Sequence, residues 1–229
     1  MNTRLHAVAP PESQQPAGPW HRSIVAVDLE GSTTRTNPAK GELRRVMYDL
    51  LEHSLEAAQI TANHLEPLTD RGDGVLILVR PHDDVPKTVL LGRLIPLLTY
   101  MLSEYNAAIR DPALRMRLRA VVHAGEVHDD SRGFYGEAID VAIKLLDSAA
   151  VKTALRQAES PLALVVSEEI YFGIVAHGYV GSEGYCPLAR VRVTNKLRRG
   201  WVCIPDPRAS LALPPPGQGD HPAHLLRSA

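Results

Sequence analysis

The order of apolar segments along the chain predicts an α+β fold with a ferredoxin-like βαββαβ core. An uninterrupted apolar run at residues 24–27 is typical of a strand covered on both faces. Apolar residues that recur every three or four positions between residues 41 and 60 predict an amphipathic helix. Two glycines around a carboxylate, at residues 72–74, predict a tight turn between two adjacent strands. Together these segments give the first half of the strand–helix–strand–strand–helix–strand order.

The remaining elements follow from the same periodicities. Residues 85–109 carry a dense apolar pattern that predicts a long, deeply packed helix, which Pro96 kinks or divides. Later segments predict a buried strand at 118–123, a helix at 136–148, a strand at 162–167, a short helix at 168–176, and a hairpin of 189–194 and 201–204 around residues 196–200.

Length and composition predict one compact domain with two tails. The chain has 229 residues, of which 45% are apolar, enough for a single core. Residues 1–20 and 206–229 are rich in proline and small polar residues, so we expect a flexible N-terminal arm and a flexible C-terminal tail. The domain between them is expected to span residues 21–205.

The charge balance and the hydropathy exclude several classes of protein. A formal net charge of −1 argues against a protein that binds nucleic acid, which normally carries a basic excess. No apolar run is long enough to span a bilayer, and no signal-peptide pattern is present. Cys186 and Cys203 match no metal-binding spacing. We therefore expect a cytoplasmic protein with reduced thiols and no membrane or nucleic-acid partner.

The chemistry is expected to centre on Asp28, which directly follows the first buried strand. Gly31, Ser32 and Thr33 then form a small-residue turn whose backbone N–H groups can converge on an anion. On this stretch alone, the simpler interpretation is that Asp28 and Ser32 cap the following helix. If the hairpin at residues 72–74 lies beside the first strand, Asp73 meets Asp28, and hard divalent cations relieve the repulsion between the two carboxylates.

Four stretches, VAVDLEGST, DRGDGVLIL, LRAVVHAGEV and YGEAIDVAIKLLDSA, resemble the class III nucleotidyl cyclase catalytic domain in order and spacing. They span about residues 22–148. The resemblance implies a mixed, mostly antiparallel sheet with helices on one face. It also implies two Mn²⁺ or Mg²⁺ ions held by Asp28, Asp73 and the carbonyl of Leu29.

The resemblance further implies a reaction. In the family, the ribose 3′ hydroxyl of a nucleoside triphosphate attacks the α-phosphorus and pyrophosphate leaves. Backbone N–H groups of Gly31, Ser32 and Thr33 would hold the phosphates. The site would lie between two chains in a head-to-tail homodimer, with a basic residue near the last hairpin reaching the phosphates. Lys196, Arg198 and Arg199 are the candidates, although each is individually more typical of a solvated hairpin tip.

The positions that read the base depart from the family pattern. Thr69 stands where adenylyl cyclases have a lysine, and Gly133 where they have the partner aspartate. On a strand, residues 69, 71 and 73 would point the same way, so Arg71 would face the cleft. Arginine there would crowd a purine but could donate to the carbonyl oxygens of a pyrimidine. This favours UTP and the pyrimidine cyclases of Pycsar anti-phage defence, with a downstream effector that responds to the cyclic nucleotide. A structural ion pair of Arg71 with Asp70 or with the metal carboxylates is almost as well supported.

A second departure lies on the helix after residue 136. Where the family has an asparagine and an arginine four residues apart, this chain has Asp140 and Lys144. We assign them to ribose binding and to transition-state stabilisation, although they could simply pair with each other. His123 and Glu126 are less suggestive, because a lone histidine at a strand end is usually structural. Purine cyclase activity, or a cyclase-like nucleotide-sensing or dimerisation module without turnover, therefore remain as alternatives.

Overall fold

The computed structural model describes residues 17–130 and 132–208. Its strands are β1 (Ala17–Leu29), β2 (Thr69–Asp70), β3 (Gly74–Val79), β4 (Leu118–Asp129), β5 (Phe134–Tyr135), β6 (Leu162–Ser167), β7 (Cys186–Val193) and β8 (Lys196–Cys203). Its α-helices are α1 (Asn37–Ala57), α2 (Lys87–Val89), α3 (Ile95–Ala108), α4 (Glu137–Leu146), α5 (Ala149–Gln157) and α6 (Glu168–Gly173). A 3₁₀ turn, η1 (Ser32–Thr34), lies between β1 and α1.

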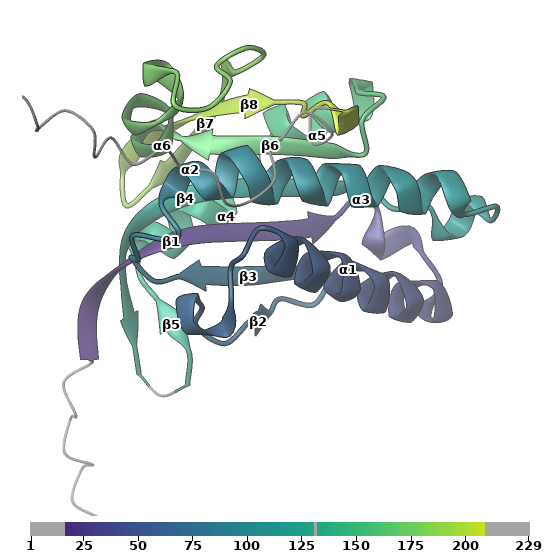
Figure 1. The fold of residues 1–229 in the computed structure, drawn as a ribbon, viewed down its shortest axis with the longest axis horizontal. Helices are drawn as coiled ribbons and strands as arrows, with labels where there is room; N and C mark the ends of the chain where they lie inside the picture. The colour runs from purple at the N-terminus through teal and green to yellow at the C-terminus, as the bar shows by residue number, and fades with distance from the viewer. Residues whose placement is uncertain (1–16, 131, 209–229) are drawn as a thin grey trace, which may run out of the picture.

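The strands form one sheet in the order β2-β3-β1-β4-β6-β8-β7, with β5 paired to β4 (Figure 1). All neighbouring strands run antiparallel except β4 and β6. The first part of the chain therefore has the βαββαβ connectivity of a ferredoxin-like core, with β1 in the centre between β3 and β4. The predicted α+β class and the mostly antiparallel sheet are confirmed.

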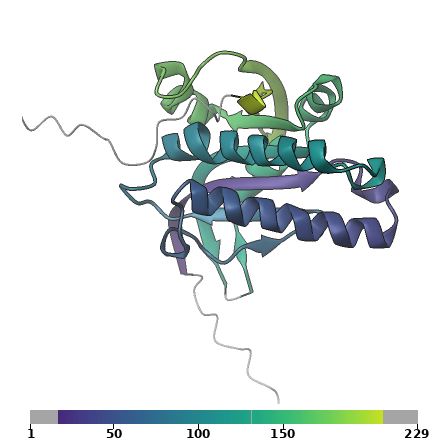
Figure 2. The same ribbon diagram turned by 45° about the vertical axis from the view of Figure 1, so that its right-hand side comes forward.

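The helices cover both faces of the sheet, and the expectation that they lie on one face was wrong. Val25 and Val27 point into a core formed with α1 and α3, which lie side by side in Figures 1 and 2. Ile24 and Ala26 point the other way, into a second core formed with α4 and α5. This arrangement accounts for the uninterrupted apolar run of β1, because a strand covered on both sides has no solvent-facing positions.

Several boundaries differ from the expected ones. β1 begins at Ala17, so the last residues assigned to the N-terminal arm are in the sheet, and residues 1–16 and 209–229 lie outside the described part. The long helix begins at Lys87, and a π-helical segment at Leu90–Leu94 precedes α3. Because Pro96 has no N–H group to donate, it fits the first turn of α3, directly after this irregular segment.

The last hairpin also differs from the prediction. Its turn is at Thr194 and Asn195, which adopt left-handed backbone conformations with φ of 45° and 62°. Positive φ at both central residues is the geometry of a two-residue type I′ turn, which asparagine tolerates. Residues 196–200 therefore belong to strand β8 and do not form the tip of the hairpin.

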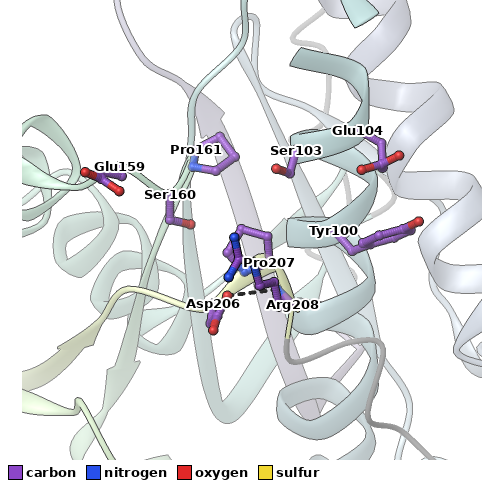
Figure 3. Close-up of a pocket in the computed structure, with 9 residues that line it drawn as sticks. All are labelled: Tyr100, Ser103, Glu104, Glu159, Ser160, Pro161, Asp206, Pro207 and Arg208. Atoms are coloured by element: carbon purple, nitrogen blue, oxygen red, sulfur yellow. Dashed lines mark hydrogen bonds between the residues drawn. The ribbon is translucent and has the colours of Figure 1, made fainter. Parts of the chain in front are cut away.

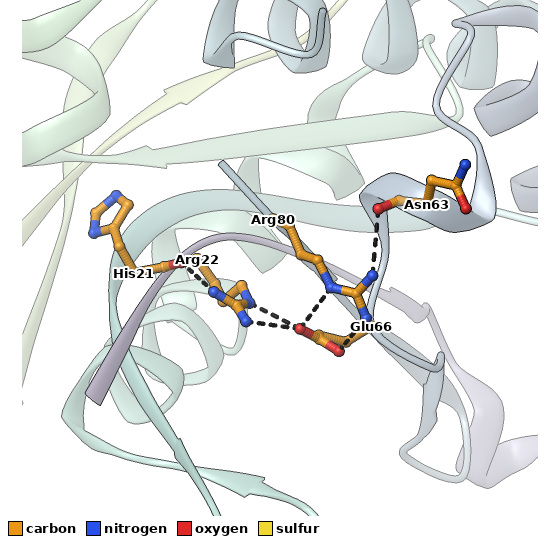
Figure 4. A network of polar contacts seen from close by, with 5 residues as sticks. All are labelled: His21, Arg22, Asn63, Glu66 and Arg80. Atoms are coloured by element: carbon orange, nitrogen blue, oxygen red, sulfur yellow. Dashed lines mark hydrogen bonds and ion pairs between the residues drawn. The ribbon is translucent and has the colours of Figure 1, made fainter. Parts of the chain in front are cut away.

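An ion-pair network ties β1 to the segment around β3 at the end of the sheet remote from Asp28 (Figure 4). The Glu66 carboxylate, with a side chain only 11% exposed, accepts from Arg22 of β1 and from Arg80, which follows β3. These hydrogen bonds, the one from Arg80 foremost, lower the pKa of Glu66. Because the register of a β-pair is fixed along its whole length, this network also supports the β1–β3 alignment at the opposite end.

Gly74 allows β1 and β3 to approach each other at the point where Asp28 and Asp73 meet. A Cβ at this position would lie 2.4 Å from the carbonyl oxygen of Val27, so any side chain requires the backbone to shift. We expect Gly74→Ala to lower the free energy of unfolding by about 1–3 kcal/mol, as overpacking does. Urea denaturation followed by circular dichroism measures this loss.

The matched control is Gly41→Ala, in α1, where a Cβ meets no atom within 4 Å. There the substitution should stabilise the protein by about 0.5–1 kcal/mol, because alanine has the higher helix propensity. Equal effects of the two substitutions would show that the close approach at Gly74 is not a constraint.

Candidate active site

The structure places Asp28 and Asp73 side by side at the end of two neighbouring strands. Asp28 lies opposite Gly74 in the β1–β3 register, and the N–H of Leu29 donates to the carbonyl of Asp73 at 2.9 Å. Both carboxylates line one cavity of about 160 Å³. The structure therefore brings together the two carboxylates, one at the end of β1 and the other in the turn directly before β3.

Arg119 of β4 forms a bidentate ion pair with Asp28. Its Nε and Nη2 donate to the two carboxylate oxygens, each at 2.7 Å, and the two side chains are only 11% and 18% exposed. Burial raises the pKa of Asp28, although the hydrogen bonds and charge of Arg119 lower it. Arg119 is the main residue that the sequence analysis missed. Its signal was the cross-strand register, which sets Arg119 directly opposite Asp28.

Asp73 has a different partner. The hydroxyl of Ser32, which is buried in the turn after β1, donates to its Oδ2. No basic side chain of the described residues forms an ion pair with Asp73. The turn is possible because Gly31 adopts a left-handed conformation with φ of 70°. Ser32, Thr33 and Asp73 then line a second cavity, of about 220 Å³, on the side of α1.

Arg71 lines the first cavity together with both carboxylates. Its N–H closes the hairpin by donating to the carbonyl of Gly74 at 2.9 Å. The alternative ion pair with Asp70 is not formed, because Asp70 binds Arg44 through two hydrogen bonds of 3.1 and 2.7 Å. Thr69 of β2 pairs with Leu76 of β3 and lines neither cavity. Of the two base-reading candidates, the structure brings only Arg71 to the carboxylates.

Asp140 and Lys144 are not brought to the carboxylates within one chain. Asp140 is exposed, and the ammonium of Lys144 donates to the carbonyl of Arg192 in β7 at 3.0 Å instead of pairing with Asp140. The residues of this region that line the first cavity are Ile143, Leu146 and Asp147. Asp140 and Lys144 themselves line neither of the two cavities.

The three basic candidates on the last hairpin differ in their surroundings. Lys196 and Arg199 are exposed, whereas Arg198 forms an ion pair with Glu137 of α4 and a second with Glu169 at 3.9 Å. A residue already held by two carboxylates is less available to a phosphate than its neighbours.

His123 and Glu126 are structural residues in this fold. The Nδ1 of His123, which is 3% exposed, lies 2.8 Å from the Ser167 hydroxyl and 3.5 Å from the Glu169 carboxylate. The contact with His123 lowers the pKa of Glu169 to about 2. Glu126 pairs with the exposed His21 on the neighbouring strand. Neither lines the cavity that holds Asp28 and Asp73.

The carboxylates of Asp28 and Asp73 offer the oxygen donors that Mg²⁺ and Mn²⁺ prefer, so the donor chemistry fits a divalent cation. Arg119 donates one hydrogen bond to each oxygen of Asp28, so a cation would bind through the remaining lone pairs and share the carboxylate with the guanidinium.

Another cluster that could hold a metal is made of His64, His82 and Asp84. There the Nδ1 atoms accept from the backbone N–H groups of Thr61 and Asp84, at 3.0 and 3.2 Å. In that tautomer the proton is on Nε2, which is the nitrogen that remains to bind a metal. A histidine that binds a metal through one nitrogen normally carries its proton on the other nitrogen and donates it to a protein acceptor. The cluster is therefore a poorer fit than the aspartate pair.

Another hollow, of about 490 Å³, lies between α3 and the segment that follows β8 (Figure 3). Its rim carries the carboxylates of Glu104, Glu159 and Asp206, and Figure 3 shows the Asp206 carboxylate bonded to the backbone of Arg208. Neither Asp28 nor Asp73 lines this hollow.

Among the helices of residues 17–130 and 132–208, none combines the length and the hydropathy that a membrane span requires.

The fold is that of solved cyclase catalytic domains. The structure resembles an adenylate/guanylate cyclase/hydrolase from Silicibacter pomeroyi, with a TM-score of 0.60, 18% identity, and coverage of 83% of this chain and 99% of that one. It also resembles the guanylyl cyclase Cya2, with a TM-score of 0.54, 16% identity, and coverage of 80% and 91%. The guanylate cyclase domain of RhGC from Catenaria anguillulae, in complex with GTP, matches with a TM-score of 0.53, 13% identity, and coverage of 82% and 98%. No family model and no curated protein matches the sequence.

We expect Arg119→Met to destabilise the protein by roughly 3 kcal/mol, because it leaves the Asp28 carboxylate largely buried without its partner. Urea unfolding of the single variants Arg119→Met and Asp28→Asn and of the double variant measures the coupling. The double variant should recover at least about 1 kcal/mol relative to the sum of the single losses. Losses that add within about 0.5 kcal/mol would show that the ion pair contributes little.

The pKa of Glu169 predicts a pH-dependent contribution to stability. Because its pKa is lowered from 4.5 to about 2, the ionised carboxylate favours the folded state above pH 4.5, and this contribution is lost as the pH falls toward 2. The urea concentration at the midpoint of unfolding should therefore be higher for the wild type than for Glu169→Gln at neutral pH. The difference between the two midpoints should become smaller at acid pH.

The matched control is Glu168→Gln, one residue earlier, because no ion pair of Glu168 is found in the described chain. A constant difference between wild type and Glu169→Gln across this pH range would contradict the assignment.

Proposed function

We propose that this protein is a metal-dependent nucleotidyl cyclase, which converts a nucleoside triphosphate into the 3′,5′-cyclic monophosphate and pyrophosphate. The proposal depends on one observation: Asp28 and Asp73 share a cavity at the end of β1 and β3, beside the turn formed by Gly31, Ser32 and Thr33. The cyclase fold agrees with this chemistry but does not by itself establish an activity.

Asp28, Asp73 and the carbonyl of Leu29 would hold two Mg²⁺ or Mn²⁺ ions. When bound, such ions lower the pKa of the attacking hydroxyl and neutralise charge on the triphosphate. The chain itself positions the substrate: the N–H groups of Gly31, Ser32 and Thr33 would bind phosphate oxygens. The Ser32 hydroxyl already orients the carboxylate of Asp73.

Arg119 has two roles in this proposal. Without a cation it neutralises Asp28, which burial would otherwise drive toward the protonated form. With a cation bound, its guanidinium would remain beside the cavity, where its planar N–H donors suit the oxygens of a phosphate. The same arginine would thus stabilise the resting site and then contribute positive charge next to the substrate.

Arg71 supports a pyrimidine substrate, with UTP as the first choice. It lines the cavity of the two carboxylates and has no ion pair within the described residues, so its N–H groups are available to a base. Uracil presents two carbonyl acceptors to a side chain that can only donate. A pyrimidine product would make the protein a source of cyclic UMP for an effector in anti-phage defence, as in the pyrimidine cyclases that the sequence resembles.

The active form is proposed to be a head-to-tail homodimer. Within one chain Asp140 and Lys144 do not line the cavity of Asp28 and Asp73. In a dimer with two-fold symmetry, the α4 surface of each chain could reach the carboxylates of the other, which would complete two equivalent sites. Lys144 would then release the carbonyl of Arg192 and approach the reacting phosphate as a point charge.

A second candidate function is a cyclase-like module that binds nucleotide without turnover. The bidentate pair of Arg119 with Asp28 favours it, because a carboxylate already neutralised by a guanidinium attracts a cation less strongly. Asp73 argues for the enzyme, since within the described residues its side chain has only the Ser32 hydroxyl as a partner and so leaves a carboxylate open to a cation. Product formation separates the two functions.

The deciding experiment is incubation of the purified protein with each of the four ribonucleoside triphosphates and Mn²⁺, with chromatographic detection of cyclic products. We expect cyclic UMP from the wild type and at least a 100-fold loss in Asp73→Ala, as for an electrostatic group at a reacting centre. Cyclic AMP as the main product would exclude the role of Arg71 but retain the enzyme. Nucleotide binding without any cyclic product would establish the binding module.

Mixing two inactive variants tests the shared site. Asp73→Ala and Lys144→Ala should each be inactive, because each removes one half of both sites. A mixed dimer regains one intact site, so an equimolar mixture should recover about a quarter of the wild-type activity. No recovery, with dimers demonstrated by light scattering, would show that both residues act within one chain or not at all.

A further inference from the structure

Lys40 presents an unpaired ammonium group at the second cavity. It lies in the first turns of α1, is partly buried, and lines the cavity together with Ser32, Thr33, Gly72 and Asp73. No hydrogen bond or ion pair of its side chain is found among the described residues. Its ammonium group is therefore not engaged by another side chain and can reach a ligand in this cavity.

The neighbouring cations on the same helix are all neutralised. Arg44, one turn further along, forms two hydrogen bonds with Asp70. Arg45 binds Glu42 and Asp49. Lys40 therefore differs from them in having its charge available to a ligand in the cavity, and that ligand has to be an anion.

Asp73 lines both cavities and so stands at the boundary between them. A ligand with one phosphorus at Asp28 and Asp73 would continue past Asp73 toward the hydroxyls of Ser32 and Thr33. A chain of phosphates is the anion that fits such a path. A single phosphate or a nucleoside monophosphate at the aspartates would not extend into the second cavity.

We propose that Lys40 binds the terminal phosphates of the nucleoside triphosphate and thereby positions the leaving pyrophosphate. This inference rests on the proposed function, since it assumes that the α-phosphorus lies between Asp28 and Asp73. It assigns to α1 a binding residue in the same chain that supplies both carboxylates. Lys40 acts on the part of the substrate that does not carry the base.

The test compares Lys40→Met with the matched control Arg45→Met, which removes a charge of the same sign from the same helix but outside the cavity. The first readout is binding of inorganic triphosphate, with Mg²⁺, by isothermal titration calorimetry. We expect Lys40→Met to weaken it about 10- to 100-fold, the value of one charge-assisted hydrogen bond, and Arg45→Met to leave it unchanged.

The second readout uses the purified enzyme with its best nucleoside triphosphate. Lys40→Met should raise KM by a similar factor, and Lys40→Arg should restore part of the loss by returning the charge. Inhibition by the matching nucleoside monophosphate should stay within about twofold, because that ligand has no terminal phosphates. Thermal unfolding of each variant verifies that it is folded.

The outcomes separate the two proposals. Triphosphate affinity that is the same in wild type and Lys40→Met would overturn the role of Lys40, while cyclic product from both would leave the proposed function intact. Triphosphate binding that depends on Lys40, without any cyclic product, would support the subsite and reject the cyclase. A wild-type protein that binds no triphosphate would overturn the Lys40 inference directly.

Discussion

The backbone pairing of β1 with β3 is the constraint on which the candidate site depends. The hydrogen bond from Leu29 to Asp73 and the register of Asp28 opposite Gly74 set two acidic side chains at the same end of two strands. Like charges repel, so this proximity depends on the pairing of the strands and on the neutralisation of Asp28 by Arg119. Cores on both faces hold β1, and the Glu66 network anchors the opposite end of the same strand pair.

The electrostatic balance at this end is uneven. Asp28 is neutralised by Arg119, whereas Asp73 is held by an uncharged hydroxyl. Arg71 and Lys40 stand on either side of Asp73, each without an ion pair in the described chain. The cleft thus has one satisfied carboxylate, one open carboxylate and two available cations, which is the charge pattern expected of a site that binds an anion and a metal together.

Local sequence patterns predicted the strands and helices that define the class of the fold, together with the aspartate after the apolar run and the glycine-flanked turn at Asp73. The meeting of the two aspartates was expected only on condition that the strands pair, and the resemblance to a known family supplied that condition. The same patterns could not predict what faces Asp28 from β4, since Arg119 reaches it only through a long-range strand pairing. They also misplaced the last hairpin, because Thr194 and Asn195 are weaker turn signals than the glycine at residue 200. Gly200 is needed for packing instead, since a Cβ there would lie 2.8 Å from Val165.

The pairing of Arg119 with Asp28 has a consequence for the stability of the metal-free protein. Structural zinc domains unfold when chelated, since the metal is part of their core. Here the guanidinium of Arg119 supplies the counter-charge at Asp28, and the two hydrophobic cores are built from apolar side chains without a metal ligand. Chelation of the metal should therefore abolish a metal-dependent activity without unfolding the protein, so that the folded state in the cell does not depend on the supply of ions.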